Sequence, residues 1–201
     1  MMRLTKLEQL FIANSPIKAE EFFVEVAESS PYYQERNEWS WANFTNLMDV
    51  EIYNCPNLDR LPRELITELP NVQSLNVAVN YGISAEQLKA DWEALIDGAS
   101  GEDIQILYIG FNNLEETPST DYLRRMKKIG LLDCNSNRLR VAHPFGKEVS
   151  LTTIYLDNNR ITEISAAEDG YFCGINLMET FSCSHNKLTE LPDIFTARSI
   201  Y

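Results

Sequence analysis

Residues 151–164, LTTIYLDNNRITEI, have a spacing of apolar side chains that fits neither a helix nor a plain strand. A short strand would direct Ile154 and Leu156 to one side, and a tight turn after it would bring Asn159 and then Ile161 into the same core. One such unit can bury very little apolar surface alone. The stretch therefore predicts that similar units stack against it on both sides.

The rest of the chain repeats this pattern, with seven copies in total. The copies begin at Leu7, Leu47, Val72, Ile104, Ile129, Leu151 and Met178. Five copies hold an asparagine at the turn: Asn80, Asn112, Asn137, Asn159 and Asn186. Ser15 and Cys55 replace it in the first two copies and are expected to serve fewer backbone groups than an amide. Cys134 and Cys183 occupy a core position held elsewhere by Ile, Val or Leu, so we interpret them as buried apolar residues.

These copies resemble the leucine-rich repeat, whose consensus is LxxLxLxxN/CxL. The resemblance covers nearly the whole chain. It implies an α/β solenoid of about seven repeats, with a curved parallel sheet on the concave side and helices and irregular connections on the convex side. It also implies that the five asparagines form a structural ladder. A buried turn leaves polar backbone groups that need hydrogen-bond partners, which such a ladder supplies.

Two connections between copies are unusually long. Residues 18–46 form the first insertion, where Phe22, Phe23 and Val26 fit one face of a helix that Pro31 closes off. An aromatic cluster follows, and it either packs the extra helix onto the solenoid or forms a contact surface. Its members are Tyr32, Tyr33, Trp39, Trp41 and Phe44.

The second insertion predicts a convex-side helix over residues 84–98. Ser84 and Gln87 have the spacing of a capping box, and Gly98 ends the apolar periodicity. Shorter connections, PRELITELP and STDYLRRMKK, are expected to form a turn or two of helix, whereas HPFGKEV is expected to be extended.

The units ILYIGFNNLEETP and GLLDCNSNRLR are similar to irregular leucine-rich repeat proteins of Bacteroidetes-type bacteria, many of them cell-surface lipoproteins. This resemblance implies a cell-surface or secreted location for the full-length protein. The alternative is the cytoplasm, because the start MMRLTKLEQLF does not read as a signal peptide. We expect residues 1–201 to be a single repeat domain that lacks its caps, and uncapped ends favour pairing with a second copy.

The charge and cysteine pattern argue against several classes of partner. The net charge is −13, whereas binding to nucleic acid or an anionic membrane needs clustered positive charge. No apolar run approaches the roughly 20 residues that would span a bilayer. The four cysteines form no CxxC pair, so neither a disulfide framework nor a zinc site is indicated.

No catalytic constellation is recognisable. Only two histidines occur, and the repeat places His185 on the concave side while Cys183 points into the core; His143 is expected to be solvated. There is no GxSxG, HExxH or phosphate-binding glycine loop. Asp133 and Asp157 lack the ligand-dense loop that calcium prefers. We therefore expect no enzyme activity, metal or cofactor.

The residues that alternate with the core positions of each strand are predicted to face outward on the concave side. We select seven of them as candidate partner-binding residues: Glu51, Tyr53, Asn76, Tyr108, Asp133, Tyr155 and Asp157. Tyrosines suit recognition, and the acidic residues would complement a partner with basic or hydrogen-bond-donating groups. An ordinary solvated sheet face is the alternative. The sequence thus predicts a non-catalytic module that binds a protein of unknown identity; a scaffold segment of a larger surface protein and a glycan-binding surface are alternatives.

Overall fold

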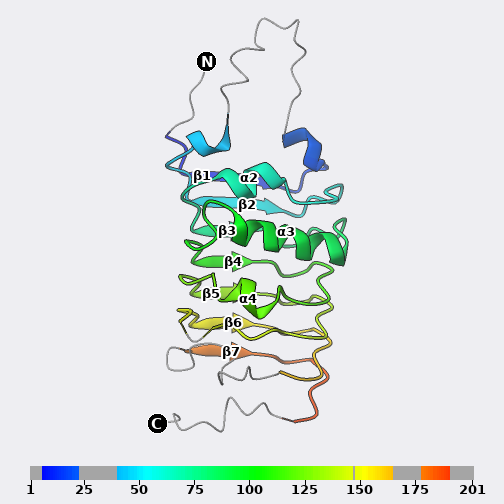
Figure 1. The fold of residues 1–201 in the computed structure, drawn as a ribbon. Coiled ribbons are helices and arrows are strands. Elements are labelled where there is room, and N and C mark those ends of the chain that lie inside the picture. Colours follow the sequence, from blue (N-terminus) through cyan, green and yellow to red (C-terminus); the bar gives the residue numbers. More distant parts are fainter. Residues whose placement is uncertain (1–5, 23–39, 147, 165–177, 191–201) are drawn as a thin grey trace, which may run out of the picture.

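The computed structural model describes residues 6–22, 40–146, 148–164 and 178–190, and in them seven strands form one open parallel sheet in sequence order (Figure 1). The expected solenoid is confirmed. The strands are β1 (Gln9–Ala13), β2 (Asp49–Tyr53), β3 (Ser74–Asn76), β4 (Ile106–Tyr108), β5 (Leu131–Asp133), β6 (Thr153–Tyr155) and β7 (Thr180–Ser182).

The strands pair in a register that repeats the sequence pattern. The central apolar residue of each strand pairs with that of the next: Leu10, Val50, Leu75, Leu107, Leu132, Ile154 and Phe181. Except in β1 and β7 these residues are fully buried, and their neighbours on either side are more exposed. Because side chains alternate along a strand, one face of the sheet meets the core and the other, which we call the concave face, points away from it.

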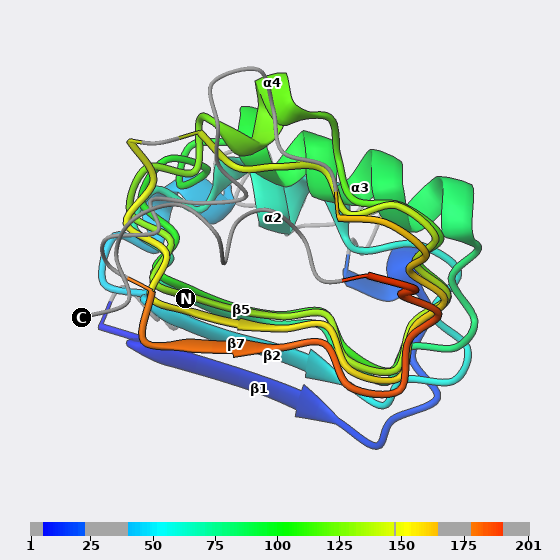
Figure 2. The same ribbon diagram turned by 90° about the horizontal axis from the view of Figure 1, so that it is seen from below.

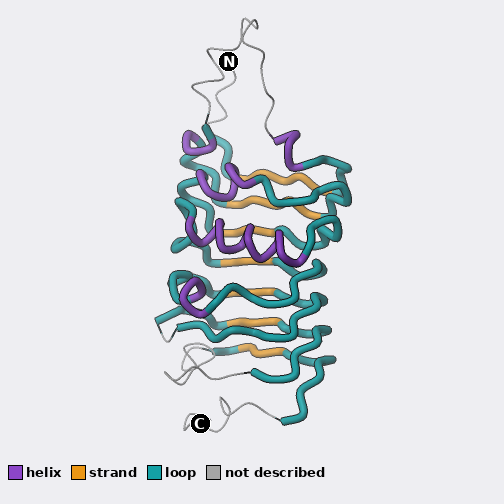
Figure 3. The backbone as a smooth tube through the Cα atoms, turned by 45° about the vertical axis from the view of Figure 1, so that its right-hand side comes forward, coloured by secondary structure: helices purple, strands orange, loops and turns teal. Residues whose placement is uncertain are grey.

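Helices lie on the side of the core opposite the strands (Figure 2). They are α2 (Arg63–Glu68), α3 (Ala85–Asp97) and α4 (Thr120–Leu123), with the 3-10 turns η1 (Ala19–Phe22) and η2 (Trp41–Asn43). Loops join each strand to the convex side and back, so strands and helices form two separate rows (Figure 3). No helix within the described residues has the length and apolar character needed to cross a membrane.

Helix α3 fills the second insertion, where the sequence places it. The Ser84 hydroxyl accepts a hydrogen bond from the Gln87 N–H at 3.2 Å, and Gly98 stands at the other end. The Gln87 side chain donates to the Asp91 carboxylate at 2.7 Å, so it is engaged along the helix and not in the reciprocal bond of a capping box. Trp92 and Leu88 are fully buried on the face that meets the core.

The turn after each strand is built the same way in all seven repeats. One residue there has positive φ, between 52° and 61°, and it is Asn14, Asn54, Val79, Phe111, Ser136, Asn158 or His185. The first six donate their N–H to a carbonyl of the next repeat, at 2.7 to 3.3 Å. The hydrogen-bond ladder of the sheet therefore continues through the turn, which holds the left-handed conformation in place.

Directly after this residue, the five asparagines form a ladder along the solenoid. The Asn159 Oδ1 atom accepts from the Leu139 N–H of the preceding repeat at 3.0 Å, while its Nδ2 atom donates to the Cys134 and Leu156 carbonyls, each at 3.0 Å. Asn137 and Asn186 make the equivalent bonds, each to its own and the preceding repeat. Asn80 and Asn112 donate in the same way, but their Oδ1 atoms accept from the N–H of the preceding ladder residue itself, Cys55 or Asn80. The buried backbone groups of the turns are satisfied in this way.

Cys55 holds the ladder position of the second repeat. Its thiol lies 3.8 Å from the Ile12 carbonyl of the preceding repeat and 3.6 Å from the Tyr53 carbonyl of its own, and its single S–H can donate to one of them. The Cys55 N–H donates to Asn80 Oδ1 at 2.9 Å. The thiol therefore serves fewer backbone groups than an asparagine amide, as expected, and through weaker sulfur bonds. Cys134 is fully buried, as its core position predicts.

The first insertion is described only in part. Trp41 and Phe44 are buried in the core, and their ring centroids lie 5.2 Å apart. Of the two alternatives for these residues, packing onto the solenoid is therefore the one observed. Residues 23–39, with Phe23, Val26, Pro31, Tyr32, Tyr33 and Trp39, lie outside the described residues, as do residues 191–201.

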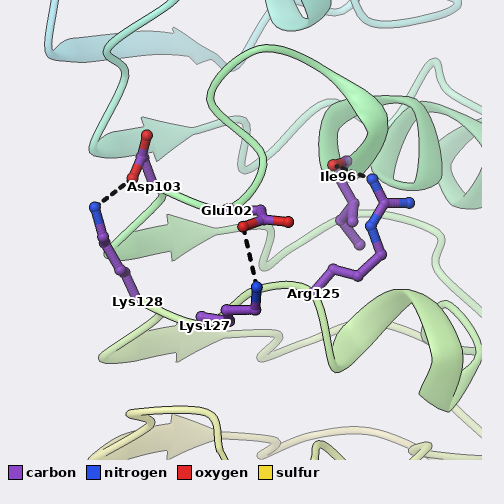
Figure 4. Close-up of polar contacts among 6 residues, drawn as sticks. All are labelled: Ile96, Glu102, Asp103, Arg125, Lys127 and Lys128. Carbon is purple, nitrogen blue, oxygen red and sulfur yellow. Dashed lines mark hydrogen bonds and ion pairs between the residues drawn. The ribbon is translucent and has the colours of Figure 1, made fainter.

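Ion pairs join the fourth and fifth repeats at the surface. Lys127 binds Glu102 at 3.2 Å, Lys128 binds Asp103, and Arg125 reaches the Ile96 carbonyl at 3.3 Å (Figure 4). The two ion pairs are partly exposed, so each contributes little to stability. Together with the Arg125 contact, they give all three basic residues partners on the preceding connection.

Candidate functional site: the concave face

The concave face consists of three columns of residues, one residue per repeat in each. The column between the two core positions of each strand runs Phe11, Glu51, Asn76, Tyr108, Asp133, Tyr155 and Ser182. The column at the strand start runs Gln9, Asp49, Ser74, Ile106, Leu131, Thr153 and Thr180. The third column begins Ala13, Tyr53 and continues just past the shorter strands with Ala78, Gly110, Asn135, Asp157 and Ser184.

The sequence-based selection omits the column at the strand start. Ile106 and Leu131 in this column are half-buried apolar side chains beside Tyr108 and Asp133. Strand alternation could have predicted this column, because it exposes the residue before a core position as well as the residue after it.

The concave face has a shallow depression of about 440 Å³ at the carboxyl ends of β2 to β5. We call it the aromatic depression. Its lining residues are Tyr53, Asn76, Ala78, Val79, Tyr81, Tyr108, Gly110, Phe111 and Asp133. Four of the seven selected residues are therefore brought together here: Tyr53, Asn76, Tyr108 and Asp133. Glu51, Tyr155 and Asp157 lie on the same face but outside the depression.

Three of the lining residues, Val79, Tyr81 and Phe111, were not selected from the sequence. They belong to the turns that follow β3 and β4. Tyr81 is 57% exposed and Phe111 47% exposed, which are high fractions for large apolar rings. Val79 and Phe111 hold positive φ, where the other five repeats have asparagine, serine or histidine. A branched apolar residue is costly there, on the order of 1–2 kcal/mol.

Two carboxylates of neighbouring repeats, Asp133 and Asp157, lie on the concave face, and Asp133 lines the depression. Asp133 pairs in register with Tyr155, and its Oδ1 atom accepts from the Asn135 N–H at 2.8 Å. Asp157 Oδ1 accepts from the Ser182 hydroxyl and from the Ser184 N–H, both at 2.6 Å. Burial, and secondarily the negative charge of Asp157, raises the pKa of Asp133 above its ordinary value.

No basic residue occurs in the three columns. Among the residues that the structure describes, no lysine, arginine or histidine forms an ion pair with Asp49, Glu51, Asp133 or Asp157. Arg138, Arg160 and Lys187 follow the ladder asparagines instead, and they are exposed outside the columns. The concave face is thus negatively charged, and no side chain of its three columns neutralises that charge.

The described residues offer little that resembles an active site. His143 was expected to be solvated, but its side chain is only about one-third exposed (32%), and its Nε2 atom lies 3.9 Å from Glu116 Oε2. The backbone N–H of His143 donates to the Thr117 hydroxyl at 2.9 Å. His185 is exposed in its turn. Burial raises the pKa of the Cys55, Cys134 and Cys183 thiols, which disfavours the reactive thiolate. Within the described ranges, no group of three or more His, Cys, Asp or Glu residues could hold a metal ion.

Two solved structures of Bacteroides proteins resemble the chain over 99% of its length. A leucine-rich repeat protein from Bacteroides eggerthii DSM 20697 is 46% identical with a TM-score of 0.87, and the match covers 32% of that chain. A leucine-rich repeat protein from Bacteroides thetaiotaomicron VPI-5482 is 45% identical with a TM-score of 0.84, and the match covers 24% of that chain.

Among curated proteins, human lumican is 32% identical over 88 residues, which are 44% of this chain and 25% of lumican. Human podocan-like protein 1 is 29% identical over 138 residues, or 67% of this chain and 25% of that protein. The chain therefore spans only about a quarter of the curated relatives it matches. No protein-family model matches it.

The seven-strand parallel sheet, the asparagine ladder and these relatives agree on one family. The structures from Bacteroides share both the fold and nearly half of the residues along almost the entire chain. The chain is a leucine-rich repeat protein, similar to those of Bacteroides.

Proposed function

We propose that the chain is a non-catalytic module that binds another protein on its concave face. The observation that supports this most is the face itself: seven strands present three columns of side chains that no described helix covers. A leucine-rich repeat fold suggests a protein-interaction module, and a rigid open sheet holds large side chains in place before a partner arrives, which lowers the entropic cost of binding.

Tyrosine rings are the expected anchors of such a contact. Tyr108 and Tyr155 are half-buried in the middle column, two repeats apart, with Asp133 between them. Half-buried tyrosines combine a large apolar area with a hydroxyl, and residues of this kind dominate binding energy at protein interfaces. We expect the two rings to lie at the centre of the contact.

The test compares three forms of the chain as bait for proteins from bacterial and host extracts. The wild type and the single variant Tyr122→Ala should retain the same partner, whereas the double variant Tyr108→Ala/Tyr155→Ala should lose it. Tyr122 is the matched control because it is also a half-buried tyrosine but lies on α4, away from the sheet. Each form is first melted to verify folding. A folded double variant that retains the partner would reject the concave face as the binding surface.

A further inference from the structure

The aromatic depression has walls of rings and a floor of small residues. Tyr53, Tyr81 and the pair Tyr108 and Phe111 contribute rings from the second, third and fourth repeats, and Ala78 and Gly110 are the small lining residues. A Cβ atom on Gly110 would lie 3.2 Å from Asp133 Oδ1 and 3.1 Å from the Asn135 carbonyl oxygen. Because residue 110 is a glycine, the approach to the Asp133 carboxylate from the depression stays open.

The Asp133 carboxylate, which lines the depression, accepts fewer hydrogen bonds from the described residues than it could. Asp133 Oδ1 accepts one hydrogen bond, from the Asn135 N–H, and within the described residues Oδ2 accepts none. An ionised carboxylate can accept about four hydrogen bonds. The half-buried Asp133 therefore retains capacity for a donor that approaches from the depression.

Aromatic rings beside a carboxylate that has no cationic partner favour the binding of a positively charged side chain. A guanidinium or ammonium group is attracted to ring faces within about 6 Å of the centroid, and more strongly when water is partly excluded. The chain itself shows such a contact elsewhere, where the Arg125 guanidinium lies 6.0 Å from the centroid of the Tyr122 ring. In the depression no described residue supplies this cation.

Three features make the depression costly for the isolated chain. Val79 takes a positive φ of 61° that asparagine would adopt at lower cost, and Phe111 exposes nearly half of its ring to water. The negative charge of Asp157, on the next repeat, disfavours the charged form of Asp133. A ligand that is apolar along its stem and cationic at its tip would cover the exposed ring and offset the like charges.

From these contacts we infer that the aromatic depression receives an arginine or lysine side chain from an extended segment of the partner protein. The inference rests on the proposed function and adds the chemistry of the partner to it. The stem of the side chain lies against Tyr108 and Phe111, and the charged head donates to Asp133. Charge complementarity with a face that has four carboxylates and no basic residue selects a cation over a neutral or acidic side chain.

The experiment is a titration of the isotope-labelled chain, followed by NMR, with three blocked amino acids of similar length: N-acetyl-arginine amide, N-acetyl-lysine amide and the neutral N-acetyl-glutamine amide. We expect the two cationic probes to shift the backbone amides of Val79, Tyr108, Gly110 and Phe111, with a millimolar dissociation constant. The glutamine probe should bind about tenfold more weakly or not at all.

Matched variants assign the two contributions. Asp133→Asn should weaken the arginine probe about tenfold, whereas Asp49→Asn, which removes a carboxylate from the strand-start column, should leave it unchanged. Tyr108→Ala should also weaken the probe, and Tyr108→Phe should retain it because the ring face is kept. Equal shifts from the arginine and glutamine probes, or no shifts from any probe, would overturn the inference.

Failure of this inference is distinct from failure of the proposed function. If Asp133→Asn binds a captured partner at full strength while Tyr108→Ala/Tyr155→Ala does not, the concave face binds but the cationic anchor is wrong. If both variants bind as well as the wild type, the concave face is not the binding surface.

Discussion

At the scale of single residues, the ladder asparagines join neighbouring repeats of the solenoid. Each one accepts a backbone N–H from the preceding repeat and donates to carbonyls of both repeats, and four of the five, Asn80, Asn112, Asn137 and Asn159, are buried. The consensus pattern predicts this role for all five asparagines, because a buried tight turn has the same unmet groups in every copy.

Replacing Asn159 with alanine should therefore be strongly destabilising. The change leaves the Leu139 N–H without its partner in a buried turn. It also removes one of two amide donors from the Cys134 and Leu156 carbonyls, which keep their bonds from Asn137 and Asn186. We expect a loss of about 3 kcal/mol in the free energy of unfolding, measured by urea denaturation. Asn57→Ala is the control: it removes one exposed bond to the Pro16 carbonyl and should cost less than about 0.5 kcal/mol. Equal losses in the two variants would contradict the role of the ladder.

The left-handed turn position gives a reciprocal pair of substitutions. Val79→Asn places in the third repeat the residue that Asn14, Asn54 and Asn158 provide in theirs, and should raise the free energy of unfolding by about 1 kcal/mol. Asn158→Val should lower it by a similar amount. Thermal melts of both variants measure the effect, and a loss of stability in Val79→Asn would show that the Val79 backbone is not strained.

The pH dependence of Asp133 tests the cost of its charge. Burial, and then Asp157, raises its pKa in the folded chain above the ordinary 3.8, so the folded state holds the proton more tightly than the unfolded state. The contribution of Asp133 to the free energy of unfolding is fully present below pH 3.8 and is lost as the pH rises through the raised pKa of the folded state. Asp133→Asn keeps an acceptor for the Asn135 N–H and should match the wild-type melt at pH 3. At pH 7 it should melt about 1–2 °C higher, a gain on the order of 0.5 kcal/mol. A variant that is less stable at pH 7 would contradict this sign.

At the scale of elements, the second insertion shows how a helix is attached to the solenoid. Asp91, buried on α3, accepts from the Leu61 N–H and from the Gln87 side chain, both at 2.7 Å. Asp91→Ala should leave the Leu61 N–H unsatisfied and cost about 1–3 kcal/mol, whereas removal of the exposed Glu86 from the same helix should cost little. Urea denaturation checks both, and a neutral Asp91→Ala would show that this bond does not hold α3 in place.

The same scale shows what sequence could and could not predict. The middle column of the concave face followed from the repeat, because strand alternation fixes the direction of Glu51, Asn76, Tyr108, Asp133 and Tyr155. The contributions of Val79, Tyr81 and Phe111 did not follow, because the direction of a turn side chain depends on a left-handed backbone that valine and phenylalanine do not signal. The contact between His143 and Glu116 could not be predicted from the sequence either, because it depends on how two connections that are far apart in the chain pack together.

At the scale of the whole molecule, the distribution of charge separates the two sides of the solenoid. Basic residues on the connections bind carboxylates of a neighbouring repeat: Lys127 and Lys128 bind the preceding repeat, and Lys89 binds Glu116 of the following one. The concave face keeps its carboxylates without such partners in the described residues. With a net charge of −13, the chain should attract basic partners over a distance set by the salt concentration.

The most direct test of the central claim is hydroxyl-radical footprinting of the tyrosines with a captured partner bound. If the concave face is the binding surface, Tyr108 and Tyr155 should lose most of their labelling in the complex, while Tyr122 on the convex side keeps the labelling of the free chain. Protection of Tyr122 with unchanged labelling of Tyr108 and Tyr155 would contradict the account.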